Sequence, residues 1–192
     1  MKVRFLVLIA GAGIAADACA NPFATTATLA TIDDTAAIFA LTGAPESAPT
    51  AINVSFPRAV ITTPAEHYDV VFDIRHDSAF ALPPHAVGAA LIAGLQLATK
   101  PYDAITEAPT SGYNDTLPIF IKAGDVLLVQ SASSLCAGQG VAARTFIYAK
   151  IVIDSIFYDD AAPPHVPRTM WYRLRNDPNC GFISFADGIP KT

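Results

Sequence analysis

The chain has 192 residues, of which 52% are hydrophobic and 15% are charged, and its formal net charge is −5. This composition can form a buried core, which excludes a chain that is disordered by composition. The acidic balance also excludes the clustered basic face that nucleic acid binding requires, so we expect no nucleic acid partner.

The first 20 residues have the features of an export signal. Lys2 and Arg4 give a positive start, and the run 5–16 is apolar but too short to span a bilayer. Small residues follow, so cleavage after Ala20 is one expected outcome. The other is lipidation, because the sequence ADAC resembles the lipobox of bacterial lipoproteins and ends in Cys19. In that case the protein would contact a membrane only through its lipid anchor.

The same stretch contains GAGIAA, which has the spacing of a dinucleotide-binding turn. That function needs a helix directly after the glycines, where its N-terminal N–H groups can hold a phosphate. Pro22 interrupts any such helix, and the Thr-rich residues after it do not favour one. We therefore prefer the export signal, expect no cofactor, and keep a nucleotide-binding enzyme as a third alternative.

Residues 21–36 are rich in Thr and Ala, which is typical of a tether between an anchor and a domain. Residues 37–192 are then predicted to form a single domain. A chain of this length is long enough for one sizeable core and too short for two.

The predicted domain consists of short strands. In AINVSF, for example, apolar and polar residues alternate with the period of two that marks a half-buried strand. Residues 144–158 predict one long strand whose second face is also partly covered. Two short strands are expected in AVGAALIAGLQLAT, and another begins YDAITEAPTSGYNDT. The other predicted strands are HYDVVFDIRHD, a hairpin around 122–125, and a final hairpin formed by TMWYRLR and GFISFA.

Loops are predicted at SAFALPPH and at DDAAPPHVPR because of their prolines. The total is nine or ten strands with no clear amphipathic helix. This pattern predicts an all-β, antiparallel, two-sheet β-sandwich of the Ig-like or jelly-roll-like kind, with a partly closed barrel as the alternative.

The cysteines are consistent with export. Cys136 and Cys180 both lie near loops, and loop cysteines in an exported protein are candidates for a disulfide. The alternative is two separately buried free thiols.

Motifs for catalysis and metal binding are absent from the sequence. It has no G-x-S-x-G, no H-E-x-x-H and no C-x-x-C. A weak metal candidate is formed by His67, Asp69 and Asp73, which share one face of a predicted strand and combine imidazole with carboxylates. The alternative, which we prefer, is an ordinary solvated sheet face.

A surface for binding is suggested by Trp171 and Arg173, which point outward if the alternate residues of that strand face the core. An exposed Trp beside an Arg can stack on a sugar ring or on a partner's side chain. Tyr102 and Tyr113 could extend the surface. In the alternative interpretation, a neighbouring loop covers Trp171.

The sequence therefore favours an exported or lipid-anchored bacterial cell-envelope protein, located in the periplasm, at the outer membrane or outside the cell. We expect a non-catalytic binding or structural module whose partner is a protein or glycan at the cell surface. The alternative is a secreted or periplasmic hydrolase with catalytic residues on its loops.

Overall fold

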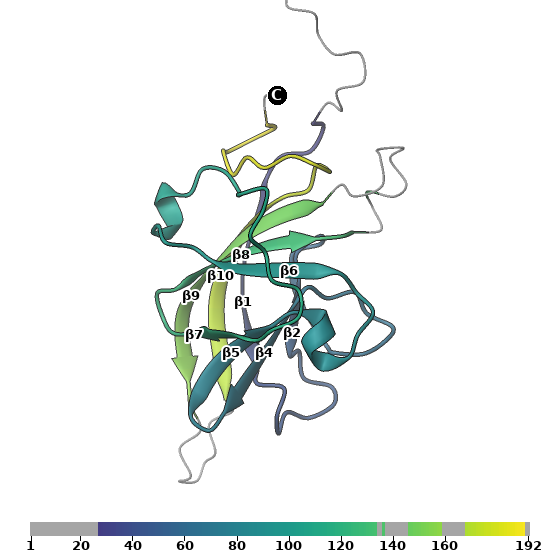
Figure 1. The fold of residues 1–192 in the computed structure, drawn as a ribbon, viewed down its shortest axis with the longest axis vertical. Coiled ribbons are helices and arrows are strands. Elements are labelled where there is room, and N and C mark those ends of the chain that lie inside the picture. The colour runs from purple at the N-terminus through teal and green to yellow at the C-terminus, as the bar shows by residue number, and fades with distance from the viewer. Residues whose placement is uncertain (1–26, 134–135, 137–145, 159–167, 191–192) are drawn as a thin grey trace, which may run out of the picture.

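The computed structural model describes residues 27–133, 136, 146–158 and 168–190. The predicted signal with Cys19, the start of the predicted tether and the Pro-rich loop at 159–167 lie outside the described residues. The described strands form two five-stranded antiparallel sheets that face each other (Figure 1). The predicted β-sandwich is thus confirmed, and both sheets stay open among the described residues rather than closing into a barrel.

The first sheet, here sheet A, has the strand order β1-β10-β9-β8-β6. Its strands are β1 (Ile32–Phe39), β6 (Ala93–Leu97), β8 (Val126–Ser131), β9 (Ile147–Phe157) and β10 (Thr169–Asp177). Sheet B has the order β3-β2-β4-β5-β7. Its strands are β2 (Ala51–Asn53), β3 (Arg58–Val60), β4 (Val70–Arg75), β5 (Ser78–Leu82) and β7 (Ile119–Ile121).

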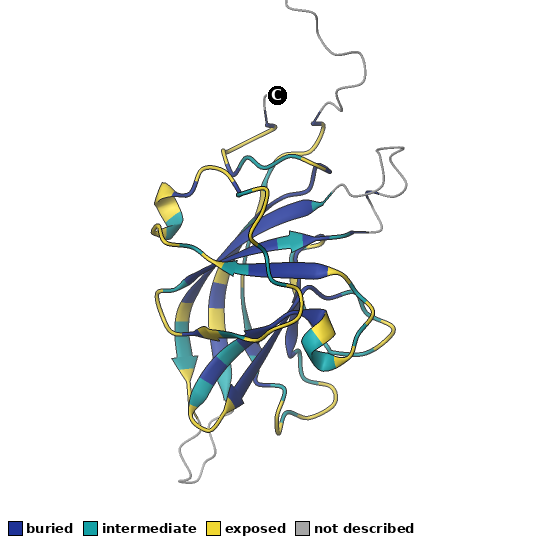
Figure 2. Ribbon diagram, in the orientation of Figure 1, coloured by how far each residue is buried: buried dark blue, intermediate teal, exposed yellow. Residues whose placement is uncertain are grey.

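The main core lies between the two sheets, where alternate residues of each strand point inward. Its largest fully buried side chains include Phe72, Leu95, Ile151 and Tyr172. Most strands are largely buried, β1 and the outward residues of β10 are exposed or half-buried, and many other exposed residues lie in loops (Figure 2). Burying this apolar surface contributes about 25 cal/mol per Å², which makes it the dominant stabilising interaction.

The strand β9 is covered on both faces, as its sequence predicted. Ala149, Ile151 and Ile153 pack into the core between the sheets. Tyr148 and Val152 point to the other side, where they pack under the loops that follow β6 and β10. The outer face of sheet A is therefore partly covered.

The strand β1 begins within the segment that the sequence assigned to a tether. All eight of its residues pair with β10, from Ile32 opposite Asn176 to Phe39 opposite Thr169. This partner lies more than a hundred residues away. Local composition therefore could not show that residues 32–36 belong to the fold.

The hairpin predicted around residues 122–125 is wrong. The turn itself forms, with the Asp125 carboxylate accepting hydrogen bonds from the backbone N–H and the ammonium group of Lys122. However, β7 before it pairs with β5 in sheet B, and β8 after it pairs with β6 and β9 in sheet A. The chain crosses between the sheets at this turn.

Other local predictions also need correction. The stretch SAFALPPH contains β5, which pairs with β4 through a tight turn at His76 and Asp77, both of which have positive φ. In AVGAALIAGLQLAT the structure has one strand, β6, preceded by the 3-10 turn η1 (Pro84–Val87). A second such turn, η2 (Tyr102–Ala104), replaces the strand expected there.

The stretch GFISFA is a loop that makes a single β-bridge, between Ser184 and Glu107, so the final hairpin is also wrong. Within the part of the chain that the structure describes, no helix is long and apolar enough to cross a membrane.

Candidate functional site

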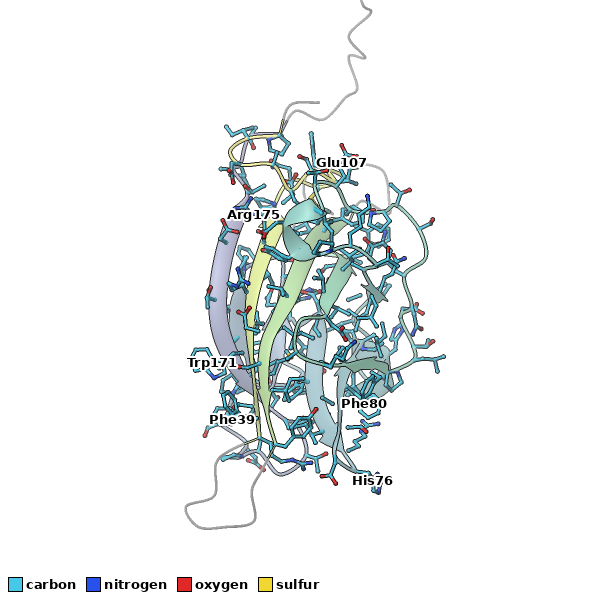
Figure 3. All side chains as sticks on the ribbon, turned by 90° about the vertical axis from the view of Figure 1, so that its left-hand side faces the viewer. Phe39, His76, Phe80, Glu107, Trp171 and Arg175 are labelled. Carbon is cyan, nitrogen blue, oxygen red and sulfur yellow. A yellow bond between two sulfur atoms is a disulfide. The ribbon has the colours of Figure 1, made fainter. Side chains whose placement is uncertain are left out.

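The outer face of sheet A carries the side chains that the sequence singled out on β10. Met170, Tyr172 and Leu174 are buried in the core, so the residues between them point outward. Trp171 is 47% exposed. Figure 3 shows Trp171 beside Phe39 near one end of this face, with Arg175 toward the other end beside η2.

A β-bulge in β9 lies next to Trp171. Trp171 pairs with Ser155 and Tyr172 pairs with Ile153, which leaves Asp154 as an extra residue in β9. Ile153 and Ile156 both pack toward the core, so Asp154 and Ser155 both belong to the outward side. Bulges commonly re-aim a side chain in this way. Here the bulge puts a carboxylate and a hydroxyl beside the exposed indole.

Arg173 forms a close ion pair with Asp154. Its Nε lies 3.1 Å from both carboxylate oxygens, and its Nη2 lies 3.0 Å from Oδ1. These hydrogen bonds raise the pKa of Arg173 above its ordinary value. The guanidinium carbon also lies 5.7 Å from the ring centre of Tyr102. Together with Trp171, Ser155 and the exposed Phe157, this pair forms what we call the Trp171 surface.

Lys150 is buried beside this surface and holds the η2 turn against the sheet. Its Nζ donates hydrogen bonds of 2.9 Å to the carbonyl oxygens of Tyr102 and Ile105, and lies 4.2 Å from the Tyr102 ring centre. Burial lowers the pKa of Lys150, and the positive charge of Arg175 lowers it further. With its ammonium group engaged in this way, Lys150 serves to position Tyr102.

Arg175 closes the far end of the face. It forms ion pairs with Asp33 on β1, at 2.6 Å, and with Asp187 in the last loop, at 2.8 Å. The hydrogen bond with Asp33 raises the pKa of Arg175 and lowers that of Asp33. These contacts join the first strand to the C-terminal loop.

Tyr113, the fourth predicted surface residue, lies apart from the Trp171 surface. Its ring centre is 6.1 Å from that of Tyr148, and its hydroxyl is buried without a partner in the described chain. A Cβ added at Gly94 would lie only 2.6 Å from the Cβ of Tyr113, so position 94 needs glycine. Tyr113 therefore packs the loop onto β6.

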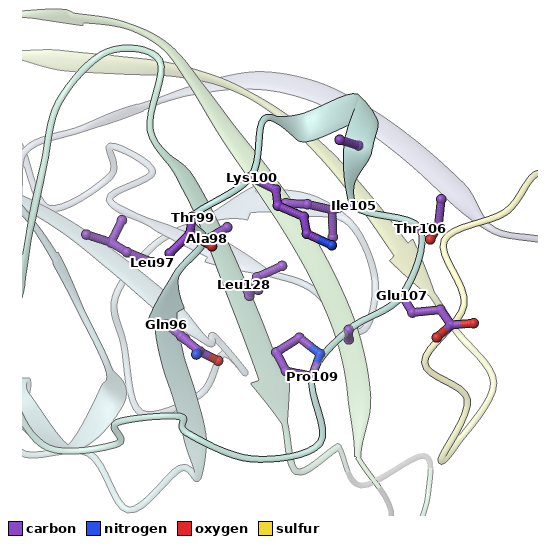
Figure 4. A pocket seen from close by; sticks show the side chains of 12 residues that line it. Gln96, Leu97, Ala98, Thr99, Lys100, Ile105, Thr106, Glu107, Pro109 and Leu128 are labelled. Atoms are coloured by element: carbon purple, nitrogen blue, oxygen red, sulfur yellow. The ribbon is translucent and has the colours of Figure 1, made fainter.

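A cavity of about 460 Å³ lies between the C-terminal end of β6, Leu128 of β8 and the loop that follows η2. Its apolar walls include Ile105 and Leu128, and Figure 4 shows Gln96, Lys100 and Glu107 around it. The Gln96 amide oxygen is buried and lacks a hydrogen-bond donor among the described residues. The cavity is thus mixed in polarity, and its two charged groups are exposed loop side chains.

The three metal candidates do not form one site in the described residues, because Asp73 has other partners. Asp73 is buried and accepts hydrogen bonds from the backbone and hydroxyl of Thr42 and from Arg75 Nε at 2.8 Å. Burial alone would raise the pKa of Asp73, but these hydrogen bonds hold it below its ordinary value. No group of three or more potential metal ligands of the His, Cys, Asp and Glu types is found in the described segments.

Asp69 is also fully buried, so these acids do not lie on the solvated face that the sequence favoured. Asp69 accepts hydrogen bonds from the Val54 backbone N–H, at 2.7 Å, and from the Ser131 hydroxyl, at 2.5 Å. His67 Nε2 lies 3.1 Å from the same carboxylate. The group Ser131, Asp69 and His67 cannot act as an acyl-transfer triad, because Ser131 is inaccessible and bonds to the acid instead of the imidazole.

Cys136 and Cys180 form a disulfide, as predicted. The sulfur atoms pack with Ile147 in a small buried cluster behind the C-terminal end of β10. The bridge is compatible with an exported protein, because disulfides persist in oxidising compartments.

Sequence reasoning found Trp171 and Arg173 but missed their partners Asp154, Ser155 and Phe157. One signal was present in the sequence. Ile153 and Ile156 are three residues apart. Two inward-facing isoleucines at that spacing interrupt the alternation of a regular strand, and such an interruption indicates a bulge. The comparisons add no further assignment: no protein-family model and no curated protein matches the chain.

Proposed function

We propose that this chain is an exported, non-catalytic binding module that takes a neutral glycan at the Trp171 surface. The observation that carries this proposal is the half-exposed indole of Trp171 beside a bulge that presents Asp154 and Ser155. A large aromatic ring at the protein surface forgoes the favourable free energy of burial, so its exposure indicates an interaction site.

The chemistry of the surface suits a sugar ring. The C–H face of a pyranose packs on an indole, and its hydroxyl groups need donors and acceptors at the edge of that ring. Asp154 supplies acceptors, Arg173 supplies donors and Ser155 supplies both. Phe157, which is also exposed, lies on the same face two residues from Ser155 and offers a second apolar contact.

The ligand should be uncharged. Arg173 and Asp154 already neutralise each other, and their side chains are 53% and 34% exposed, so neither offers an unpaired charge. The Lys150 ammonium is buried under Tyr102 and is not available to an anion. A charged ligand would have to break the ion pair, whereas hydroxyl groups can bind at its edges.

Export to the periplasm, the outer membrane or the medium remains part of the proposal. The charge and length of residues 1–20 and the Cys136–Cys180 disulfide support it. Intact mass of the protein recovered from membrane and soluble fractions would show cleavage after Ala20, a lipid on Cys19, or neither. Retention of residues 1–20 in the native protein would overturn this part of the proposal.

Binding can be tested with the intrinsic fluorescence of Trp171, because the chain has one tryptophan. The purified protein would be titrated with neutral oligosaccharides such as cellohexaose, xylohexaose and chitohexaose. We expect at least one to change the Trp171 emission saturably, and calorimetry to show a loss of about ten-fold or more in affinity for Trp171→Ala. Asp154→Ala should weaken the same titration.

Phe120→Ala is the matched control, since Phe120 is an exposed aromatic residue on sheet B. It should bind like the unmodified protein. If none of the oligosaccharides changes the emission, or if Phe120→Ala and Trp171→Ala weaken binding equally, the glycan proposal fails.

A further inference from the structure

The outer face of sheet B carries a second cavity, which is independent of the Trp171 surface. Its volume is about 500 Å³, within the range of small-molecule sites, and it is lined by residues 62–64, 66, 68 and 87–91. Below it lies a buried apolar cluster on sheet B that includes Val60, Val71 and Leu82. Two loops, the one before β4 and the one after η1, form its walls.

Tyr68 lines this cavity, belongs to the same buried cluster and is 4% exposed. Its phenol makes no hydrogen bond within the described part of the chain, and its hydroxyl oxygen remains accessible to solvent. Burial raises the pKa of Tyr68, so its hydroxyl stays protonated and can donate a hydrogen bond. Tyr68 therefore offers the cavity an available hydrogen-bond donor.

The walls are aliphatic, and the one charged lining residue in the described part of the chain, Glu66, is neutralised by an ion pair with Arg58. Pro64, Val87, Ala89 and Leu91 supply methyl and methylene groups, and Tyr68 is the one aromatic ring among the lining residues. Among the described residues, no cationic side chain lines the cavity. Its one charged lining residue is the acid Glu66. Glu66 is held at the rim by an ion pair with Arg58 at 2.8 Å. An alkyl chain fits such walls, and a carboxylate buried there would find no cationic partner among the lining residues.

We propose that this cavity is a binding site for a free, neutral acyl compound. The carbonyl oxygen of an ester or amide accepts the Tyr68 hydrogen bond, and the alkyl chain packs between Val87, Ala89 and Leu91. The site lies on the opposite sheet from the Trp171 surface and does not depend on the glycan proposal.

The test uses the fluorescent apolar probe N-phenyl-1-naphthylamine, which is displaced by methyl octanoate or by octanoate. We expect the full chain to bind the probe, and methyl octanoate to displace it at a concentration about ten-fold or more below that of octanoate. Ala89→Trp fills the cavity and should abolish probe binding. The matched variant Ala104→Trp lies on η2, which packs on sheet A, and should leave probe binding unchanged.

Tyr68→Phe keeps the shape of the cavity and removes only the donor. It should bind the probe normally and lose about five-fold in affinity for methyl octanoate, the effect of one hydrogen bond. Circular dichroism would show whether Ala89→Trp folds. If it does not, Tyr68→Phe still tests whether the ester binds in this cavity.

Four results would overturn the proposal. These are no probe binding by the full chain, equal binding by Ala89→Trp and Ala104→Trp, no preference for the ester over octanoate, and an unchanged ester affinity in Tyr68→Phe. If the protein instead sediments together with phosphatidylcholine vesicles, the acyl group that it binds belongs to a membrane lipid. This result would overturn the assignment to a free molecule.

Discussion

Ser131 on β8 and Asp69, the residue just before β4, join the two sheets through a 2.5 Å hydrogen bond between a hydroxyl and a carboxylate, both fully buried. The same carboxylate accepts the Val54 backbone N–H. A buried acid with these partners has its hydrogen-bonding capacity used within the fold, so its role is to fix how sheet B lies on sheet A.

Replacement of this acid should be costly. We expect Asp69→Ala to lower the free energy of unfolding by about 3 kcal/mol, because it leaves Ser131 and the Val54 N–H without acceptors. Urea denaturation measures the change. Asp103→Ala, an exposed acid on η2, is the matched control and should change stability by less than about 0.5 kcal/mol. Equal effects of the two variants would contradict the cross-sheet role.

The same carboxylate should make stability depend on pH through His67. Its hydrogen bond with Asp69 raises the pKa of His67 above 6.5, and partial burial offsets this only in part. Protonated His67 therefore stabilises the fold. This contribution is fully present below the unfolded value near 6.5 and is lost as pH rises through the higher folded pKa. His67→Gln should remove that pH-dependent part, which denaturation at pH 5 and pH 8.5 would show. An NMR titration that gave His67 a pKa below 6.5 would contradict this.

The disulfide should contribute substantially to stability. It joins residues 44 apart in sequence, for which loop-closure entropy predicts about 4 kcal/mol. We expect the Cys136→Ser/Cys180→Ser variant to unfold at correspondingly lower urea concentration. A reductant should destabilise the unmodified protein and leave the double variant unaffected. In a Cys19→Ser background, two reactive thiols in unfolded, unreduced protein would show that the bridge does not form.

Lys150 should control the mobility of η2. In Lys150→Met the carbonyl groups of Tyr102 and Ile105 lose their donor, so the backbone N–H groups of residues 104–105 should exchange hydrogen at least about ten-fold faster. The exposed Lys122, which pairs with Asp125 in its own turn, provides the control Lys122→Met. If exchange at η2 rises equally in both variants, Lys150 does not hold the turn.

Trp171 should report its own exposure. Since its side chain is 47% exposed, its emission should lie between that of a buried indole and that of free tryptophan, and acrylamide should quench it readily. Arg173→Ala should increase the quenching rate by removing a neighbouring side chain. A blue-shifted emission that resists quenching would eliminate Trp171 as a binding platform.

The sequence predicted features that depend on local patterns. The two covered faces of β9 and the outward direction of Trp171 and Arg173 followed from a period of two along each strand. The pairing of Cys136 with Cys180 was suggested by their positions near loops. The strand faces depend on residues that are close together in the chain, and the disulfide depends on the presence of two cysteines. Both kinds of information can be read from the sequence.

Features that depend on strand partners were not predictable in this way. Residues 122–125 have the composition of a hairpin turn, and nothing in the neighbouring residues shows that β7 and β8 belong to different sheets. The turn between β4 and β5 uses His76 and Asp77 with positive φ, where sequence rules expect Asn or Gly. The position of Asp154 beside Trp171 depends on the bulge, and therefore on the register of β9 against β10.

The pairing of β1 with β10 has a consequence for how the chain is made. During synthesis β1 has no partner in sheet A, among the described strands, until residues 169–177 have emerged from the ribosome. Such distant pairing slows folding, because a long loop must close first. A nascent chain that stops before residue 169 would expose the edges of both β1 and β9, so a prematurely terminated product should aggregate or be degraded.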